Sequence, residues 1–265
     1  MYSRIQLAEK YLRYFLTASN RKGHGVHSPF VYELVRSVLM DDSVYAEYAS
    51  IEGLRRRLLR DRSLLNVEDL GAGSVRGASQ TRSVKDIARL VAKPAKLGQL
   101  LFRLARHYQP SVMIELGTSL GLSTAYLAAG NPNGKIWSIE GSAAVAERAR
   151  GHLMELGSKN AAVITGNFDE VLEPLLEQLG PIGLAFVDGN HRCEPTIRYF
   201  DLFFRHSGRS AMLIFDDIHW SGEMEKAWVQ IKTDPRVMLT IDLFFFGLVV
   251  IRDEFRVRQD FRIRM

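Results

Sequence analysis

Residues 112–121 read Val-Met-Ile-Glu-Leu-Gly-Thr-Ser-Leu-Gly, and this stretch decides the fold. The mainly apolar residues 112–116 predict a short buried strand. Gly117 and Gly121 then predict a tight turn into a helix over 122–129. A strand that leads through a glycine-containing turn into a helix is the first half of a βαβ unit.

The same alternation continues after this turn. Further strands are predicted at 135–140, 162–165, 182–188 and 211–216, and helices at 143–156, 170–178, 196–204 and 223–231. Residues 237–241 and 243–251 are adjacent strands with no room for a helix between them, so they predict an antiparallel hairpin. The sequence therefore predicts a Rossmann-like α/β fold with a seven-stranded, mostly parallel sheet and an antiparallel terminal hairpin.

The residues before this fold are predicted to be mainly helical. Apolar residues recur at helical spacing within 1–60, and Ser28-Pro29 is a helix start. The polar, glycine-bearing residues 63–85 predict a connection. A nucleotide-binding turn is resembled within it by Val67-Glu-Asp-Leu-Gly-Ala-Gly73. Because no strong strand precedes this stretch, we predict that it is a loop. We divide the chain into an N-terminal helical and loop extension, 1–96, and a main domain, 97–265.

Composition limits the class of protein. The chain is 46% hydrophobic and 25% charged, as in ordinary globular proteins, and its single cysteine, Cys193, excludes an intramolecular disulfide. We see no secretory signal at the start and no apolar run long enough to cross a membrane, so we expect a cytoplasmic protein without a membrane partner. The net charge is +5, but no aromatic residues interleave with the basic segments, so a solvated helix face is favoured over nucleic-acid binding.

The first turn indicates the cofactor class. Ligands of parallel sheets lie beyond the carboxyl ends of the strands. The glycines are spaced Gly-x-x-x-Gly, with Thr118 where a dinucleotide fingerprint has its second glycine, so a nicotinamide dinucleotide is disfavoured. S-adenosylmethionine (SAM) has no pyrophosphate and needs only a looser turn. Glu140 ends the next strand, where an acid can accept hydrogen bonds from both ribose hydroxyls.

Together, the Glu-x-Gly-x-x-x-Gly turn, Glu140, the strand ending in Asp188 and the terminal hairpin resemble the class I SAM-dependent methyltransferases over about residues 97–251. Within that class the chain is most similar to the small O-methyltransferases of the catechol and caffeoyl-CoA type. The resemblance implies a SAM site formed by Glu115, Gly117, Ser119, Gly121, Ser123, Glu140, Gly166, Asn167 and Asp188.

The resemblance also implies a divalent-metal site on Asp188, Asp216 and Asp217, with Asp217 in place of the family's asparagine. Carboxylates that converge at strand ends are costly without a cation, and hard oxygen ligands favour Mg²⁺ or Ca²⁺ over zinc. His191 stands where the family often has a lysine base, so we expect His191 and Asp188 to be catalytic. The alternatives are helix capping or cofactor contact for the aspartates, and a helix-start or supporting role for His191.

Neighbouring histidines are assigned less specific roles. We expect His219 and Trp220 to line an acceptor pocket, with a plain packed turn as the alternative. His24 and His27 are spaced as metal ligands can be, but no third ligand is visible nearby, so we expect loop packing or acceptor contact.

The function expected from these residues is SAM-dependent O-methylation of a small hydroxylated acceptor, assisted by a divalent metal. One alternative keeps SAM but methylates a protein, an amine or RNA. Another is a non-catalytic SAM-binding protein whose N-terminal helices form a homodimer. A metal requirement supports the first hypothesis, and salt-sensitive RNA binding supports methylation of RNA. In the resembling family, N-terminal additions shape the acceptor pocket or mediate dimerisation.

Overall fold

The computed structural model describes residues 1–19, 27–68, 79–91 and 94–265, and it divides into two compact units. One unit comprises residues 1–41 and 181–265, and the other comprises residues 42–180. Within the described ranges, no helix is both long and apolar enough to cross a lipid bilayer.

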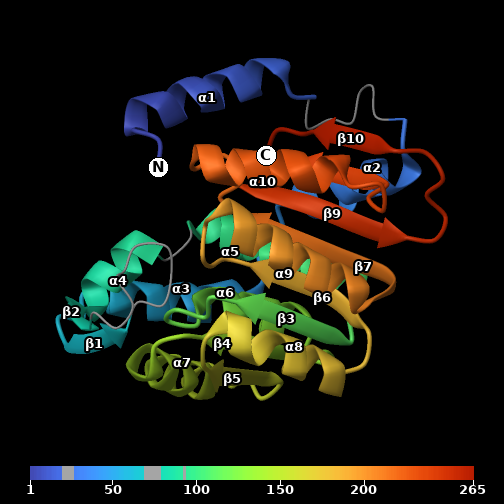
Figure 1. Cartoon of the computed structure of the whole chain (residues 1–265). Coiled ribbons are helices and arrows are strands. Elements are labelled where there is room, and N and C mark those ends of the chain that lie inside the picture. The colour runs from blue at the N-terminus through green and yellow to red at the C-terminus, as the bar shows by residue number, and fades with distance from the viewer. Residues whose placement is uncertain (20–26, 69–78, 92–93) are drawn as a thin grey trace. The chain divides into compact units, whose positions relative to one another are not determined.

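The unit formed by residues 42–180 contains the predicted βαβ units. Its parallel strands lie in the order β3 (Val112–Leu116), β4 (Lys135–Glu140) and β5 (Ala161–Thr165). Each strand is followed by a helix: α6 (Leu122–Gly130), α7 (Ala143–Glu155) and α8 (Phe168–Gln178). Helices α7 and α8 both lie against β4 (Figure 1). The strand, turn and helix predicted from residues 112–129 are confirmed.

Three further helices belong to this unit: α3 (Ala46–Leu58), α4 (Val84–Val91) and α5 (Ala95–Tyr108). Helices α5 and α6 approach very closely at Gly130, where an added Cβ would lie 2.4 Å from the carbonyl oxygen of Phe102. Because that neighbour is backbone, only glycine fits at this crossing. The rings of Tyr48, Phe102 and Tyr126 pack beside the crossing and form the centre of this core.

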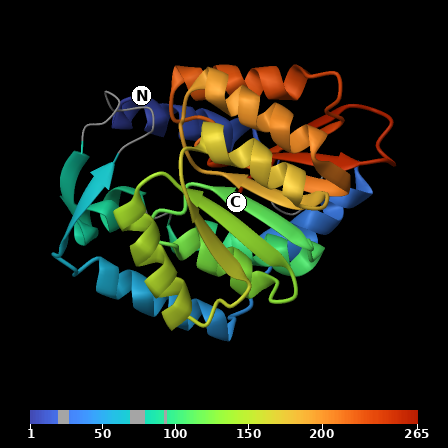
Figure 2. The ribbon, with the colours of Figure 1, turned by 60° about the horizontal axis from the view of Figure 1, so that its bottom comes forward.

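Residues 63–85, predicted as a connection, contain two strands that were not predicted. Strands β1 (Leu64–Glu68) and β2 (Ser79–Ser83) pair as an antiparallel hairpin, which lies beside α4 (Figure 2). The physical reason is that Leu65 and Val67 alternate onto one face of β1 and pack against the helical core. Most of the motif at 67–73 falls outside the described residues, so its predicted loop stays a prediction.

The other unit carries the remaining strands of the sheet, in the order β10-β8-β9-β7-β6. Their bounds are β6 (Ile182–Val187), β7 (Ser207–Asp216), β8 (Leu239–Asp242), β9 (Phe246–Arg252) and β10 (Gln259–Arg262). Strands β6 and β7 are parallel, whereas β9 is antiparallel to both β7 and β8, so the predicted terminal hairpin is confirmed. Helices α9 (Cys193–Arg205) and α10 (Gly222–Thr233) lie side by side (Figure 1).

Strand β10 was not expected from the sequence, and it makes the sheet eight-stranded rather than seven-stranded. Its residues, Gln-Asp-Phe-Arg, have no apolar run, and they pair in parallel with β8. The free edge of β10 is partly covered by Ser19, which forms an isolated parallel bridge with Ile263. Pairing with distant backbone therefore forms this strand, and local propensity contributes little.

The N-terminal helices of this unit agree with the helical pattern of the sequence. They are α1 (Arg4–Thr17), α2 (Pro29–Leu34) and a π-helical turn, Val35–Leu39. Ser3 and Gln6 form a capping box at the start of α1, and Pro29 occupies the first turn of α2 as predicted. The buried hydroxyl of Tyr14 lies within hydrogen-bonding distance of the carbonyl oxygens of Asp242 and Ile263, which holds α1 to the end of β8 and to the chain that follows β10.

Candidate functional site

The turn between β3 and α6 is built from residues with left-handed backbone conformation. Gly117, Ser119 and Gly121 have φ values of 96°, 47° and 84°. The amide of Gly117 donates to the carbonyl of Ile139 at 3.0 Å, and Gly121 is the N-cap residue of α6. Glycine adopts this conformation without a steric penalty, which explains both predicted glycines. The turn therefore brings backbone close to the end of β4 and presents the N-terminus of α6.

Glu140 connects the ends of the first two strands of this unit. Its carboxylate accepts hydrogen bonds from the amide of Ser119 at 2.8 Å and from the amide of Ser142 at 3.0 Å. These two hydrogen bonds hold the side chain in a fixed orientation at the end of β4.

Glu115, predicted to bind the cofactor, lies beneath the turn and is completely buried. Its Oε2 atom accepts hydrogen bonds from the hydroxyls of Ser138, at 2.6 Å, and Thr124. The hydroxyl of Thr118 in turn pairs with that of Ser138. These hydroxyls were not singled out from the sequence, because nothing in their spacing indicates that they meet. They link β3, β4 and α6 under the turn, so Glu115 supports the backbone that the ligand would contact.

The Gly166-Asn167 pair lies at the end of β5, next to Glu140. The amide of Gly166 donates to the carbonyl of Glu140 at 2.9 Å, and the Asn167 side chain caps α8 by accepting from the amide of Asp169 at 3.1 Å. Ser123, the remaining predicted cofactor residue of this unit, is half-buried in the first turn of α6. The unit thus brings Ser119, Glu140 and Gly166 together through hydrogen bonds at three strand ends.

In the other unit, the carboxyl ends of β6 and β7 bring together a group of potential metal ligands. Asp188, His191 and Asp216 each offer one ligand atom, and these atoms lie within 4.8 Å of one another. Asp216 is completely buried, and the side chain of Asp188 is only 8% exposed. His191 Nε2 lies 3.6 Å from Asp188 Oδ1, which is too far for a hydrogen bond.

Asp217, predicted as a third carboxylate ligand, is not part of this group as the described residues form it. Asp216 is the last residue of β7, and successive side chains of a strand point to opposite sides. Asp217 then enters a left-handed turn, with φ of 54°, in which its amide donates to the carbonyl of Phe245 at 2.8 Å. The structure therefore brings together two of the predicted carboxylates, Asp188 and Asp216, and the predicted catalytic residue His191.

The loop after β7 carries the two aromatic residues that were predicted to line an acceptor pocket. The ring of Trp220 lies 5.5 Å from that of His191, so Trp220 lies next to the ligand group. His219 instead bridges two carboxylates, with Nε2 2.9 Å from Asp242 Oδ2 and Nδ1 3.2 Å from Glu225 Oε1. Its contacts tie α10 to β8.

Glu225 links this loop to the N-terminal helix. Its carboxylate accepts hydrogen bonds from Tyr2 at 2.8 Å and from Lys10 at 2.9 Å, and the amide of Tyr2 donates to the carbonyl of Trp220 at 3.1 Å. Burial alone would raise the pKa of Glu225, but the hydrogen bonds from Lys10, Tyr2 and His219 outweigh burial and hold this pKa below its usual value. Tyr2 and Lys10 lie more than 200 positions from Glu225 in the chain, and no sequence signal connects them to it.

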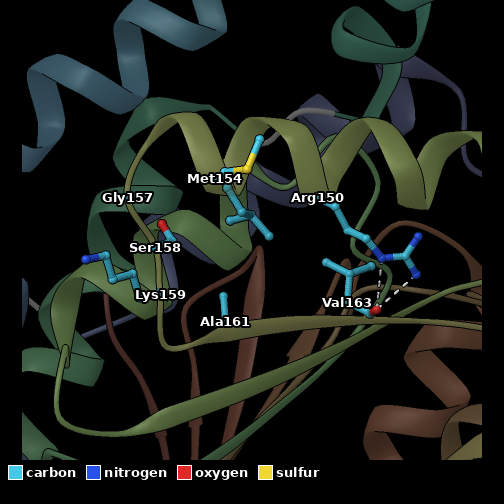
Figure 3. Close-up of a pocket in the computed structure, with 8 residues that line it drawn as sticks. Arg150, Met154, Gly157, Ser158, Lys159, Ala161 and Val163 are labelled. Atoms are coloured by element: carbon cyan, nitrogen blue, oxygen red, sulfur yellow. Dashed lines mark hydrogen bonds between the residues drawn. The ribbon is translucent and has the colours of Figure 1, made fainter.

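A separate hollow of about 290 Å³ lies between the second half of α7 and the edge strand β5 (Figure 3). It is lined by Arg150, Leu153, Met154, Gly157, Ser158, Lys159, Ala161 and Val163. The guanidinium of Arg150 donates to the carbonyl of Val163, as Figure 3 shows, and so covers part of the strand edge. No residue of this hollow belongs to the predicted cofactor or metal residues.

Three further residues of the sequence analysis are His24, His27 and Cys193. His27 is exposed, and His24 lies outside the described residues, so the predicted role of this pair stays untested. Cys193 is a free thiol at the start of α9.

Comparison with known proteins agrees with this geometry. Residues 114–218 match a methyltransferase domain. The match begins within β3, includes the turn and Glu140, and ends just after Asp217. A catechol O-methyltransferase of Mycobacterium tuberculosis is 30% identical over 144 residues, which are 51% of this chain and 62% of that protein. The chain therefore spans about 62% of the length of that relative.

Solved structures of known methyltransferases share the fold of this chain. An O-methyltransferase from Streptomyces achromogenes in complex with SAM is 24% identical, with a TM-score of 0.54 over 61% of this chain and 82% of that one. An O-methyltransferase from Bacillus cereus in complex with SAH is 18% identical, with a TM-score of 0.54 over 82% of this chain and 96% of that one. The resemblance to class I methyltransferases and the predicted Rossmann-like fold are confirmed.

Proposed function

We propose that this protein is a SAM-dependent O-methyltransferase that acts on a small hydroxylated acceptor. The observation that carries the proposal is the position of Glu140, whose carboxylate is held by the amides of Ser119 and Ser142 beside a glycine turn. A fixed acid at this point can accept the two hydroxyls of a ribose, while the turn offers bare backbone to the rest of the cofactor. The names of the relatives, catechol O-methyltransferase and O-methyltransferase, support the acceptor class.

In this proposal, eight residues of the unit 42–180 bind the cofactor: Glu115, Gly117, Ser119, Gly121, Ser123, Glu140, Gly166 and Asn167. Glu115 acts from beneath the turn because its carboxylate is buried and bonded to Ser138. Asp188 is assigned to both the cofactor and the acceptor, and His191 to the acceptor. These two side chains, at the end of β6, are 8% and 22% exposed, so surrounding protein limits the access of water to a reacting oxygen.

The donor set of Asp188, His191 and Asp216 fits a divalent cation, since two carboxylates and an imidazole offer ligand atoms in one small volume. A bound cation would supply Lewis acidity that favours ionisation of an acceptor hydroxyl. The protein residues orient the acceptor, and Trp220 provides an aromatic surface next to His191.

We further propose that residues 97–265 form the catalytic domain and that residues 1–96 are an extension that shapes the acceptor site. The contacts of Tyr2 and Lys10 with Glu225, and of Tyr2 with Trp220, support this role for α1. The proposed homodimer through the N-terminal helices is supported by Ile5, Leu12 and Leu16 of α1, whose side chains are exposed. Light scattering on the purified chain tests that assembly.

The proposed function is tested by calorimetric titration of the purified protein with SAM, followed by measurement of SAH release with a panel of catechols and simple phenols. We expect micromolar SAM binding and turnover of at least one catechol. SAM binding without turnover of any hydroxylated acceptor would favour a protein, amine or RNA acceptor or a non-catalytic role. Absence of SAM binding would refute the proposal.

A further inference from the structure

We propose that Asp188, His191 and Asp216 form a site for a first-row transition-metal ion, such as Mn²⁺, Fe²⁺, Co²⁺ or Zn²⁺, in preference to Mg²⁺ or Ca²⁺. This inference builds on the proposed function, in which a divalent cation assists methyl transfer. It differs from the sequence prediction in both the ligands and the ion, since an imidazole nitrogen takes the place of the Asp217 carboxylate. It also assigns His191 the role of a metal ligand.

The first argument is the spacing of the ligand atoms. Two ligands that bind one ion at about 2.1 Å with tetrahedral geometry lie about 3.4 Å apart. His191 Nε2 and Asp188 Oδ1 are separated by 3.6 Å, and the ligand atoms of Asp188, His191 and Asp216 lie within 4.8 Å of one another. A separation of 3.6 Å is too long for a hydrogen bond but close to the spacing that a shared ion needs. The spacing of the Asp188 and His191 atoms is therefore one that a single ion can bridge.

The second argument is electrostatic. Asp216 is completely buried and the Asp188 side chain is 8% exposed, so two carboxylates approach each other where water screens them poorly. A divalent ion compensates both negative charges at once. His191 can take part as a neutral ligand through the lone pair of Nε2, which avoids adding a further charge to the site.

The third argument is the chemistry of the donors. Mg²⁺ and Ca²⁺ bind oxygen ligands, whereas imidazole nitrogen suits zinc, iron, copper and nickel. Asp217 would have completed an all-oxygen site, but it does not join the ligand group that the described residues form. The set of one nitrogen and two oxygens leaves coordination positions open, as catalytic metal sites require. The ring of Trp220 lies 5.5 Å from that of His191.

The test is metal binding to the full chain after chelator treatment, followed by titration with Mn²⁺, Co²⁺ and Mg²⁺. Free Mn²⁺ is counted by electron paramagnetic resonance, Co²⁺ by its visible absorption, and Mg²⁺ by calorimetry. We expect Mn²⁺ and Co²⁺ to bind at least about tenfold more tightly than Mg²⁺. His191→Asp should weaken Co²⁺ binding at least about tenfold, while Mg²⁺ binding is kept or improved.

His206→Gln is the matched control, because His206 ends α9 in the same unit and does not belong to the ligand group. Pulsed electron paramagnetic resonance of Mn²⁺ in the unmodified protein should show coupling to an imidazole nitrogen, which tests the assignment without any variant. Tighter binding of Mg²⁺, absence of nitrogen coupling, or unchanged Co²⁺ binding in His191→Asp would overturn the proposal. SAM binding, measured on the same samples, separates this outcome from failure of the proposed function.

Discussion

The Glu140 carboxylate accepts a hydrogen bond from the backbone amide of Ser119 at 2.8 Å. This bond joins the acidic end of β4 to the left-handed turn after β3, so the proposed ribose acid and the turn form one structure. The geometry of the turn is therefore coupled to the charge of a side chain 21 positions later.

We expect Glu140→Gln to weaken SAM binding about 10- to 100-fold, because an amide replaces a charged acceptor worth about 1.5–3 kcal/mol. Calorimetric titration measures this change. Glu147→Gln on α7 is the control, since the Glu147 side chain is 78% exposed and should leave SAM affinity unchanged. Equal affinities for the Glu140 variant and the unmodified protein would exclude Glu140 from the cofactor site.

The close contact between α5 and α6 predicts that one added methyl group at Gly130 strongly affects stability. Gly130→Ala should lower the free energy of unfolding by about 1–3 kcal/mol, because the new Cβ meets the Phe102 carbonyl oxygen. Gly151→Ala, within α7, meets nothing within 4 Å and should raise stability by about 0.5–1 kcal/mol through helix propensity. Urea denaturation of both variants measures whether the free energy of unfolding falls for Gly130→Ala and rises for Gly151→Ala. A stabilising Gly130→Ala would contradict the close approach of α5 and α6.

Arg236 should make stability depend on pH at the acid end. It bonds to Asp234 and Asp201, and its hydrogen bonds hold the pKa of each carboxyl below the usual value. A lowered folded-state pKa stabilises the protein above the unfolded pKa of about 3.9, and this stabilisation is lost as pH falls through the folded pKa.

Arg236→Gln should therefore cost about 1 kcal/mol at pH 7, allowing for solvent screening, and less near pH 3. The rings of Phe200 and Phe204 lie near Arg236, and the loss of those contacts contributes a part that does not vary with pH. Urea denaturation at both pH values measures the difference. Arg209→Gln is the control, because the Arg209 side chain is 93% exposed. If Arg236→Gln lowers the free energy of unfolding equally at both pH values, the stabilisation does not depend on the two carboxylates.

The Glu225 contacts predict that one substitution, at Glu225, affects both α1 and the loop after β7. Glu225→Gln weakens the charged hydrogen bonds with Lys10 and Tyr2, so the amides of α1 should exchange hydrogen faster. We also expect a higher KM for the acceptor with unchanged SAM affinity. Glu194→Gln on α9 is the control, because its side chain is 76% exposed. Unchanged exchange in α1 would show that this carboxylate does not hold the helix.

The parts of the fold that depend on local pattern could be predicted from the sequence. The apolar residues of β3 followed by Gly117 and Gly121 define a strand and a left-handed turn within ten residues. Strand β10 could not be predicted, because Gln-Asp-Phe-Arg becomes a strand only by pairing with β8. The hairpin at β1 and β2 was missed because polar residues obscured the alternation of Leu65 and Val67.

The candidate site shows the same distinction between local and distant information. The sequence placed Asp188 and Asp216 at strand ends, and the structure brings them together. It could not show that Asp217, which follows β7 in a left-handed conformation, stays outside the group that the described residues form. Glu225 was not singled out from the sequence, because its contact with Tyr2 joins residues 223 positions apart.

The division of the chain into two compact units has an evolutionary consequence. The residues proposed to hold the cofactor in the turn and at the ends of β4 and β5 all lie within 42–180, whereas Asp188, His191, Asp216 and the contacts of α1 lie within 1–41 and 181–265. Mutations that diversify acceptor choice can therefore accumulate in one unit while the other is conserved. Among descendants of a common ancestor, we expect the first forty residues to diverge together with the segment from 217 to 225, and the glycine turn to change least.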